Sequence, residues 1–171
     1  MTTHTLAVLV ENKPGALTRI TTMFARRGFN IESLAVGPTE RPEVSCITLR
    51  VNCDEQPLEQ IEKQMHKLVN VLRVRELEPG DAVERELALI TISAAPERRA
   101  ELMALTDVFN ARVADVGPES LVFEVVGEPE ELDSFEELVR PHGLKELART
   151  GRIGLARAST ARAPKRQHVL R

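Results

Sequence analysis

One short stretch of the sequence combines residue types that can bind a small anion: V-E-N-K-P-G-A-L-T-R-I, from Val10 to Ile20. Asn12 has both a carbonyl acceptor and an NH2 donor, and Gly15 has no Cβ to block a close approach. A helix that starts near Pro14 or Gly15 presents unpaired N–H groups and a positive dipole end, which suit a carboxylate. Pro14 fixes the backbone φ at the entry to the helix. Its missing N–H costs nothing there, because that donor would have no partner in the helix. The stretch therefore suits a zwitterionic amino acid, but a plain N-cap and turn would use the same residues.

No other residues in the sequence form a recognisable catalytic or metal-binding pattern. The P-loop, the G-x-S-x-G elbow and the G-x-G-x-x-G fingerprint are all missing. Cys46 and Cys53 have neither a zinc nor a redox spacing, and Cys46 lies in an apolar run where burial raises the pKa of a thiol. The histidines show no metal-ligand spacing within one element; they are His4, His66, His142 and His168. We therefore expect a chain that is not an enzyme on its own and carries no cofactor or metal.

Composition narrows the class of protein further. The chain has 171 residues, of which 42% are hydrophobic and 29% charged, as expected for one or two small globular domains. Aromatic residues make up only 3%, which argues against a base-stacking surface, and a net charge of -3 argues against polyanion binding. The N-terminus does not resemble a signal peptide, and no apolar run reaches the ~20 residues of a membrane span. We expect a cytoplasmic protein with no nucleic-acid or membrane partner, and with both cysteines as buried thiols.

The stretch Val10–Ile20 is a corner between a strand and a helix. The elements that would position this corner follow a β-α-β-β-α-β order. The segment Thr5–Val10 is apolar on both faces, which is typical of a central strand, and an amphipathic helix then ends before Gly28. This order predicts a ferredoxin-like α+β domain over residues 4–78, with both helices on one face of an antiparallel sheet. A linker is expected at Glu78–Asp81. The predicted elements are the strands Thr5–Val10, Ile31–Gly37, Val44–Val51 and Val71–Leu77, the helix Ala16–Arg27, and a helix that has Pro57 as its first residue.

The second half of the chain repeats this order with little residue identity. We expect a second, degenerate domain over residues 83–158, produced by duplication of one unit. A basic flexible tail is expected at 159–171, where no acidic residue occurs. The tail is either a disordered solubilising segment or a segment that docks on an acidic partner. The predicted elements are the strands Glu86–Ser93, Arg112–Val116, Leu121–Gly127 and Leu144–Arg149, and the helices Arg98–Ala111 and Pro129–Val139.

Several runs of residues resemble a known family. The opening stretch, followed by F-A-R-R-G-F-N-I-E-S-L, is similar to the ACT domain, a small-molecule sensor of amino-acid metabolism. Over Leu6–Arg157 the chain resembles the regulatory small subunit of acetolactate synthase. The runs that carry this resemblance are Arg26–Glu40, Leu58–Val74, Val83–Leu87 and Ala148–Arg157.

The resemblance implies a function without catalysis. In that family the catalytic large subunit uses thiamine diphosphate, Mg2+ and FAD to condense two 2-oxo acids. The small subunit activates it and confers feedback inhibition, most often by valine. The expected partners of this chain are therefore the large subunit, valine, and a second copy of the chain paired through the ACT domains.

The resemblance also implies an effector site between two copies. One copy is expected to supply the corner, with Asn12, Pro14, Gly15 and Ala16, and the other to supply Asn30 and Ile31. Gly37, on the strand near that site, stands where many relatives carry alanine, and we expect this to change the side-chain fit slightly. The second repeat begins its helix with S-A-A-P-E-R-R and lacks the Asn-x-x-Gly pair. We therefore expect it to bind no amino acid and to contact the catalytic subunit.

Two other functions are compatible with part of the sequence. A stand-alone ACT-type amino-acid sensor could regulate another enzyme or transcription, but no helix-turn-helix accompanies the repeats. An independent enzyme would need a catalytic constellation, and the sequence offers none to assign.

Overall fold

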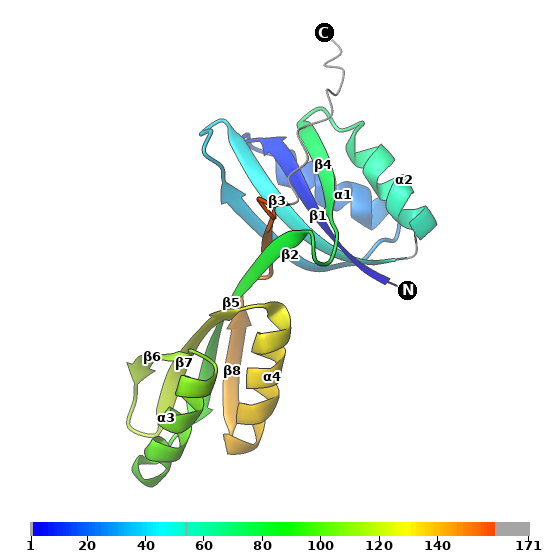
Figure 1. Cartoon of the computed structure of the whole chain (residues 1–171). Coiled ribbons are helices and arrows are strands. Elements are labelled where there is room, and N and C mark those ends of the chain that lie inside the picture. Colours follow the sequence, from blue (N-terminus) through cyan, green and yellow to red (C-terminus); the bar gives the residue numbers. More distant parts are fainter. Residues whose placement is uncertain (1, 54, 160–171) are drawn as a thin grey trace. The chain divides into compact units, whose positions relative to one another are not determined.

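The computed structural model describes residues 2–53 and 55–159, and the chain divides into two compact units (Figure 1). The first unit holds residues up to 83 together with those from 154 onward, and the second holds residues 84–153. The predicted basic tail lies outside the described residues, apart from Ser159. No helix in the described ranges has the length and apolar character needed to cross a membrane.

The first unit has the predicted β-α-β-β-α-β order. Its four strands form one antiparallel sheet in the order β2-β3-β1-β4, which makes β2 and β4 the edge strands. The elements are β1 (Thr2–Glu11), α1 (Ala16–Arg26), β2 (Ile31–Pro38), β3 (Val44–Cys53), α2 (Glu55–Met65) and β4 (Val71–Leu77).

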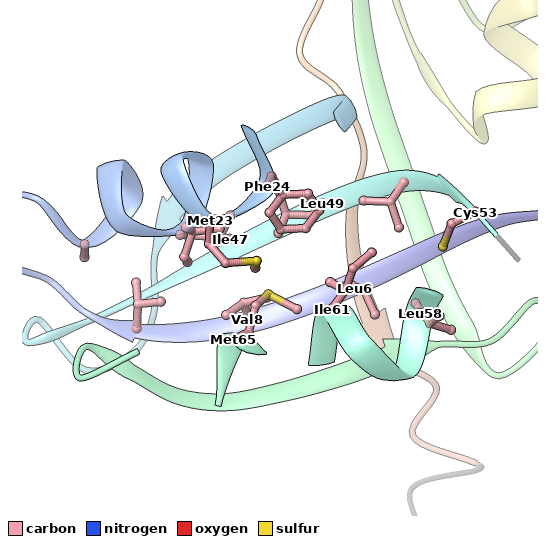
Figure 2. Packing of buried hydrophobic residues seen from close by; sticks show 14 residues of the cluster. Leu6, Val8, Met23, Phe24, Ile47, Leu49, Cys53, Leu58, Ile61 and Met65 are labelled. Atoms are coloured by element: carbon pink, nitrogen blue, oxygen red, sulfur yellow. The ribbon is translucent and has the colours of Figure 1, made fainter. Parts of the chain in front are cut away.

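Both helices of the first unit pack on the same face of this sheet. Leu6 and Val8 of β1 pair with Leu49 and Ile47 of β3, and all four side chains are fully buried. Figure 2 shows side chains of α1, including Phe24, and of α2, including Ile61 and Met65, converging on that face. Because residues of both helices belong to a single cluster with the inward residues of the strands, the expected two-layer arrangement is confirmed.

The second unit repeats the plan, with strand order β6-β7-β5-β8. Its apolar cluster again joins inward strand residues, such as Ile90 and Phe123, to both helices through Leu102 and Phe135. One further strand, β9, pairs with β5. The elements are β5 (Ala82–Ser93), α3 (Arg99–Val108), β6 (Arg112–Val116), β7 (Ser120–Gly127), α4 (Pro129–Val139), β8 (Leu144–Arg149) and β9 (Ile153–Ala156).

The structure corrects two sequence predictions and adds one strand that was not predicted. The helix α2 begins at Glu55, so Pro57 is its third residue and not its first. The helix α3 ends at Val108 and not at Ala111, because Asn110 adopts a left-handed φ of 49° that a helix cannot continue through. The strand β9 was not predicted, since it has only four residues and one of them is glycine.

Candidate functional site

The corner between β1 and α1 differs in one respect from the sequence prediction. The helix begins at Ala16, and Gly15 is the residue before it, with a left-handed φ of 86°. Pro14 therefore lies in the turn outside the helix, and Asn12 is not the N-cap. The predicted start of the helix at Ala16 is confirmed, and Gly15 stays outside it because a left-handed residue cannot take part in a right-handed helix.

The N-terminal end of α1 is open to a ligand. No side chain caps the first turn, and among the described residues the N–H groups of Leu17 and Thr18 have no hydrogen-bond partner. A Cβ placed on Gly15 would find no atom within 4 Å, so the space beside its Cα is empty. Because unpaired N–H groups and the helix dipole act in the same direction, this end of the helix favours an anion.

Asn12 is held in place by the β2–β3 hairpin. Its backbone N–H donates to the carbonyl of Glu43 at 2.7 Å, and its Nδ2 donates to the carbonyl of Pro42 at 3.0 Å. Within the ranges that the structure covers, the Oδ1 atom of Asn12 accepts no hydrogen bond. The side chain is therefore oriented by one bond and keeps its acceptor available for a ligand.

A charged residue, Glu11, lies directly before Asn12. Its carboxylate accepts hydrogen bonds from Asn70 Nδ2 at 2.8 Å and from Lys13 Nζ at 3.2 Å. These two bonds, with the Asn70 amide as the larger cause, lower the pKa of the Glu11 carboxyl below its usual value. The backbone N–H of Glu11 also donates to the Asn70 carbonyl at 2.9 Å, so the corner is tied to the turn before β4 as well.

Sequence analysis did not identify these supports of the corner. The carbonyls of Pro42 and Glu43 are backbone groups, and no residue type signals them. They could have been found only from the strand register, which pairs Glu11 with Val44 and so brings the hairpin beside Asn12.

The second group of predicted site residues lies at the start of β2. Gly28 ends α1 with a left-handed φ of 70°, and Asn30 follows as an exposed residue. No hydrogen bond to the Asn30 side chain is found in the described part of the chain. Ile31 is half-buried and packs against the core. An exposed amide thus stands next to an apolar side chain at the end of an edge strand.

The strand register separates the two groups within one chain. Ile31 lies opposite Val51, which lies opposite His4, whereas Asn12 follows Glu11 at the other end of β1. The seven residue steps from His4 to Glu11 span roughly 23 Å of strand. A single copy therefore cannot bring Asn30 and Ile31 to the corner of Asn12 and Gly15.

Gly37 lies at the same end of the sheet as the corner. It pairs with Cys46, which pairs with Leu9, two residues before Glu11. A Cβ on Gly37 would find no atom within 4 Å, so the alanine expected in many relatives would fit without a clash. The neighbouring Cys46 thiol has its pKa raised by burial, with a smaller opposite effect from its hydrogen bond with Thr48.

The corresponding corner of the second unit is filled by the chain itself. Ala94 donates its N–H to the carbonyl of Glu119, just as Asn12 does to Glu43. Arg99, the first residue of α3, donates from Nη2 to the carbonyls of Gly117 at 2.7 Å and Pro118 at 2.6 Å. A guanidinium group therefore hydrogen-bonds the hairpin carbonyls here.

No cluster of three or more His, Cys, Asp or Glu side chains suited to a metal ion occurs among the described residues of either unit.

Comparison with known proteins decides the family. Residues 6–73 match the AHAS small subunit-like ACT domain, and residues 85–158 match the small subunit of acetolactate synthase. The chain is 48% identical over 156 residues to a probable acetolactate synthase small subunit from Archaeoglobus fulgidus, covering 91% of this chain and 98% of the relative. The chain belongs to the small-subunit family of acetolactate synthase. The resemblance found in the sequence is thereby confirmed.

Two further members support the assignment. The acetolactate synthase small subunit of Mycolicibacterium smegmatis is 46% identical over 155 residues, with 91% of each chain covered. The crystal structure of the small subunit from Thermotoga maritima is 37% identical, with a TM-score of 0.85, and the match covers 92% of this chain and 98% of that one. The small-subunit family therefore accounts for both units of this chain, which confirms the expected pair of ferredoxin-like, ACT-type domains.

Proposed function

We propose that this chain is the regulatory subunit that activates the catalytic large subunit of acetolactate synthase and makes it sensitive to valine. The chain would act in the cytoplasm, in the biosynthesis of branched-chain amino acids. Thiamine diphosphate, Mg2+ and FAD, and the condensation of two 2-oxo acids, would all belong to the large subunit. The observation that carries the effector part of the proposal is the strand register, which places the two halves of the candidate site at opposite ends of one sheet.

A second copy of the chain would complete the site. The strand β2 is an edge strand, so one side of its backbone is free to pair, and Val36 on this strand is 50% exposed. If two β2 strands pair antiparallel about a two-fold axis, the start of one lies beside the end of the other. Asn30 and Ile31 of one copy then approach Asn12 and Gly15 of the other. A homodimer with two equivalent sites follows.

The groups that meet there match the three parts of valine. The carboxylate would bind the free N–H groups at the start of α1, and the ammonium would bind the Oδ1 atom of Asn12. The isopropyl group would contact Ile31 of the second copy. A carboxylate at a helix end is worth roughly 0.3–2 kcal/mol, each charge-assisted hydrogen bond roughly 1.5–3, and burial of the side chain about 1.5–3. After the cost of association, about 4–8 kcal/mol remains, which corresponds to micromolar to sub-millimolar affinity.

Purification with the catalytic subunit tests the proposal. The large subunit is expected to co-purify with this chain, to gain activity from it, and to lose that gain when valine is added. Leucine and isoleucine, tested in parallel, would define the effector class. If this chain binds valine but neither binds the large subunit nor changes its activity, it is a stand-alone sensor and the proposal is wrong.

Substitution of Gly15 tests the position of the site. Gly15→Asp places a carboxylate where the effector carboxylate would bind, so valine inhibition should be lost while activation of the large subunit survives. Gly15→Asn is the matched control, because asparagine has nearly the same shape, tolerates a left-handed φ and carries no charge. We expect the Asn variant to retain more valine affinity than the Asp variant, by about tenfold or more in calorimetry. An Asp variant that no longer activates but is still inhibited would place the site elsewhere.

A further inference from the structure

The strand β9 runs beside the part of β5 that leads into the second unit. After β8 the chain turns at Gly151, which has a left-handed φ of 75°, and returns as β9. The division into units falls between residues 83 and 84 in β5 and between residues 153 and 154 in β9. The chain therefore passes from one unit to the other twice, in two strands that pair with each other.

The returning segment is firmly attached to the second unit at its start. Thr150 donates its N–H to the Leu87 carbonyl at 3.0 Å, and its hydroxyl accepts the Leu87 N–H at 3.1 Å. Arg152 is only 9% exposed, and its Nη1 lies 3.0 Å from Glu84 Oε2. Its Nη2 also lies 3.7 Å from Glu130 Oε1, so two carboxylates compensate the buried charge and hold the segment beside β5.

The same segment is attached at its other end to the connecting residues before β5. Arg157 donates its N–H to the Asp81 carbonyl and its Nε to the Gly80 carbonyl, both at 2.9 Å. Asp81 in turn donates its N–H to the Glu78 carbonyl at 3.1 Å, and Gly80 has a left-handed φ of 88°. The residues that would otherwise form a free linker are therefore held in a defined turn by the far end of the chain.

Two of the sequence runs that carry the family resemblance meet in this element. Val83–Leu87 supplies Glu84, and Ala148–Arg157 supplies both Arg152 and Arg157. The two strands are hydrogen-bonded partners, so a change in the backbone of one alters the bonds of the other. A change that starts in residues 78–83 can therefore reach residues 153–157 and the segment bonded to Glu84 and Leu87.

We propose that β9, together with the first part of β5, is the element that transmits the effector state of the first unit to the second. The proposal rests on the effector binding proposed above and adds a route for the signal. Loss of the element should uncouple the two units: valine would still bind, and the large subunit would still be activated, but the bound valine would no longer inhibit.

Three chains reconstituted with the catalytic subunit test this. One is the full chain, one ends at Ser159 and keeps β9, and one ends at Arg152 and lacks it. We expect the first two to show the same inhibition by valine. The third should bind valine with an affinity within about threefold of the full chain, while its maximal inhibition falls at least about fivefold, the lower end of typical allosteric coupling. Equal inhibition of all three chains would overturn the proposal.

A point substitution covers the case in which the shortest chain does not fold. Arg157→Ala removes the side-chain bond to Gly80 in an otherwise complete chain, and Arg157→Lys keeps a donor at that place. Hydrogen exchange should show that valine changes the protection of residues 78–86 and 153–157 in the full chain. This response should be lost in the Ala variant and retained in the Lys variant. An unchanged response in the Ala variant contradicts the proposal, whereas a full chain that binds no valine at all contradicts the proposed function beneath it.

Discussion

Arg149 shows how a single side chain holds the second unit together. Its Nε and Nη2 donate to the two carboxylate oxygens of Glu86 at 3.0 and 2.7 Å, and its Nη1 also bonds Asp133. These carboxylates raise the pKa of the guanidinium above its usual value, so the arginine stays charged at every pH in use. Glu86 is only 7% exposed, so this arginine is the partner that pairs a buried carboxylate.

Removing this arginine should destabilise the second unit strongly. Arg149→Met keeps the aliphatic length but leaves the Glu86 carboxylate buried without its ion pair. We expect the free energy of unfolding of this unit to fall by about 2–4 kcal/mol in denaturant titration. Arg112→Met is the control, because the exposed Arg112 forms a pair with Glu124 that contributes little to stability. Equal losses in the two variants would contradict the assigned role.

A carboxyl group on α2 gives a pH-dependent prediction. Burial, and secondarily the charge of Glu76, raise the pKa of Glu62 above its usual value. The folded protein therefore binds this proton more tightly than the unfolded chain does, and stability present below the unfolded pKa is lost as pH rises through the folded pKa. We expect Glu62→Gln to raise the melting temperature at pH 7 and to have little effect below about pH 4. Glu59→Gln, on an exposed residue of the same helix paired with Lys63, should not raise it.

The sequence indicated some of the residues of the site but not what supports them. Asn12 and Gly15 were indicated by their residue types at a predicted helix entry and by the family resemblance, since a plain cap and turn would use the same residues. Their hydrogen-bond partners on the hairpin and on Asn70 were not recognisable, because long-range contacts depend on register. The start of α1 at Ala16 was predicted, but the left-handed φ of Gly15 just before it was not.

At the scale of elements, the edge strand β2 is the surface on which the effector proposal depends. Val36 lies half-exposed on it, and pairing of two β2 strands would bury this side chain in both copies. Exposed apolar side chains on an unpaired edge favour association through that edge.

A charge at this position should weaken the dimer. Val36→Glu loses apolar burial in both copies and places like charges near each other, so we expect the dimer dissociation constant to rise about tenfold or more. Analytical ultracentrifugation over a range of concentrations measures this. Val69→Glu is the control, since Val69 is 83% exposed in the turn after α2, away from β2. A Val36→Glu variant that remains as dimeric as this control would exclude the β2 edge as the interface.

The predictability of an element depended on its residue pattern and on the turn residues that flank it. The strands Val71–Leu77 and Arg112–Val116 and the helix Pro129–Val139 were predicted with the observed bounds. The four residues of β9 carry no such pattern, and they form a strand only because β5 offers a free edge beside them. Tertiary context determines such an element, and a local reading of the sequence cannot supply it.

At the scale of the whole chain, the two units divide the proposed function between them. The strands and helices of the first sheet all lie within residues 2–77, so its core does not need the second unit. The candidate effector site lies on this unit, whereas contact with the catalytic subunit is assigned to the second.

A chain that ends after Gly80 should therefore keep one activity and lose the other. We expect the fragment to fold, as judged by circular dichroism, and to bind valine in calorimetry with an affinity similar to that of the full chain. It should fail to activate the large subunit fully, because the second unit is missing. A folded fragment that releases no heat with valine and gains no thermal stability from it would contradict the division.

Arg99 has a consequence for stoichiometry. The corner before α3 matches the corner before α1 in its backbone bond to the hairpin, so each copy of the chain has two places to consider for an effector. In the second, Arg99 bonds the hairpin carbonyls of Gly117 and Pro118, which puts a guanidinium where the first unit has the amide of Asn12. A guanidinium has no acceptor for the ammonium of an amino acid. We therefore expect a dimer of this chain to saturate at two effector molecules and not four.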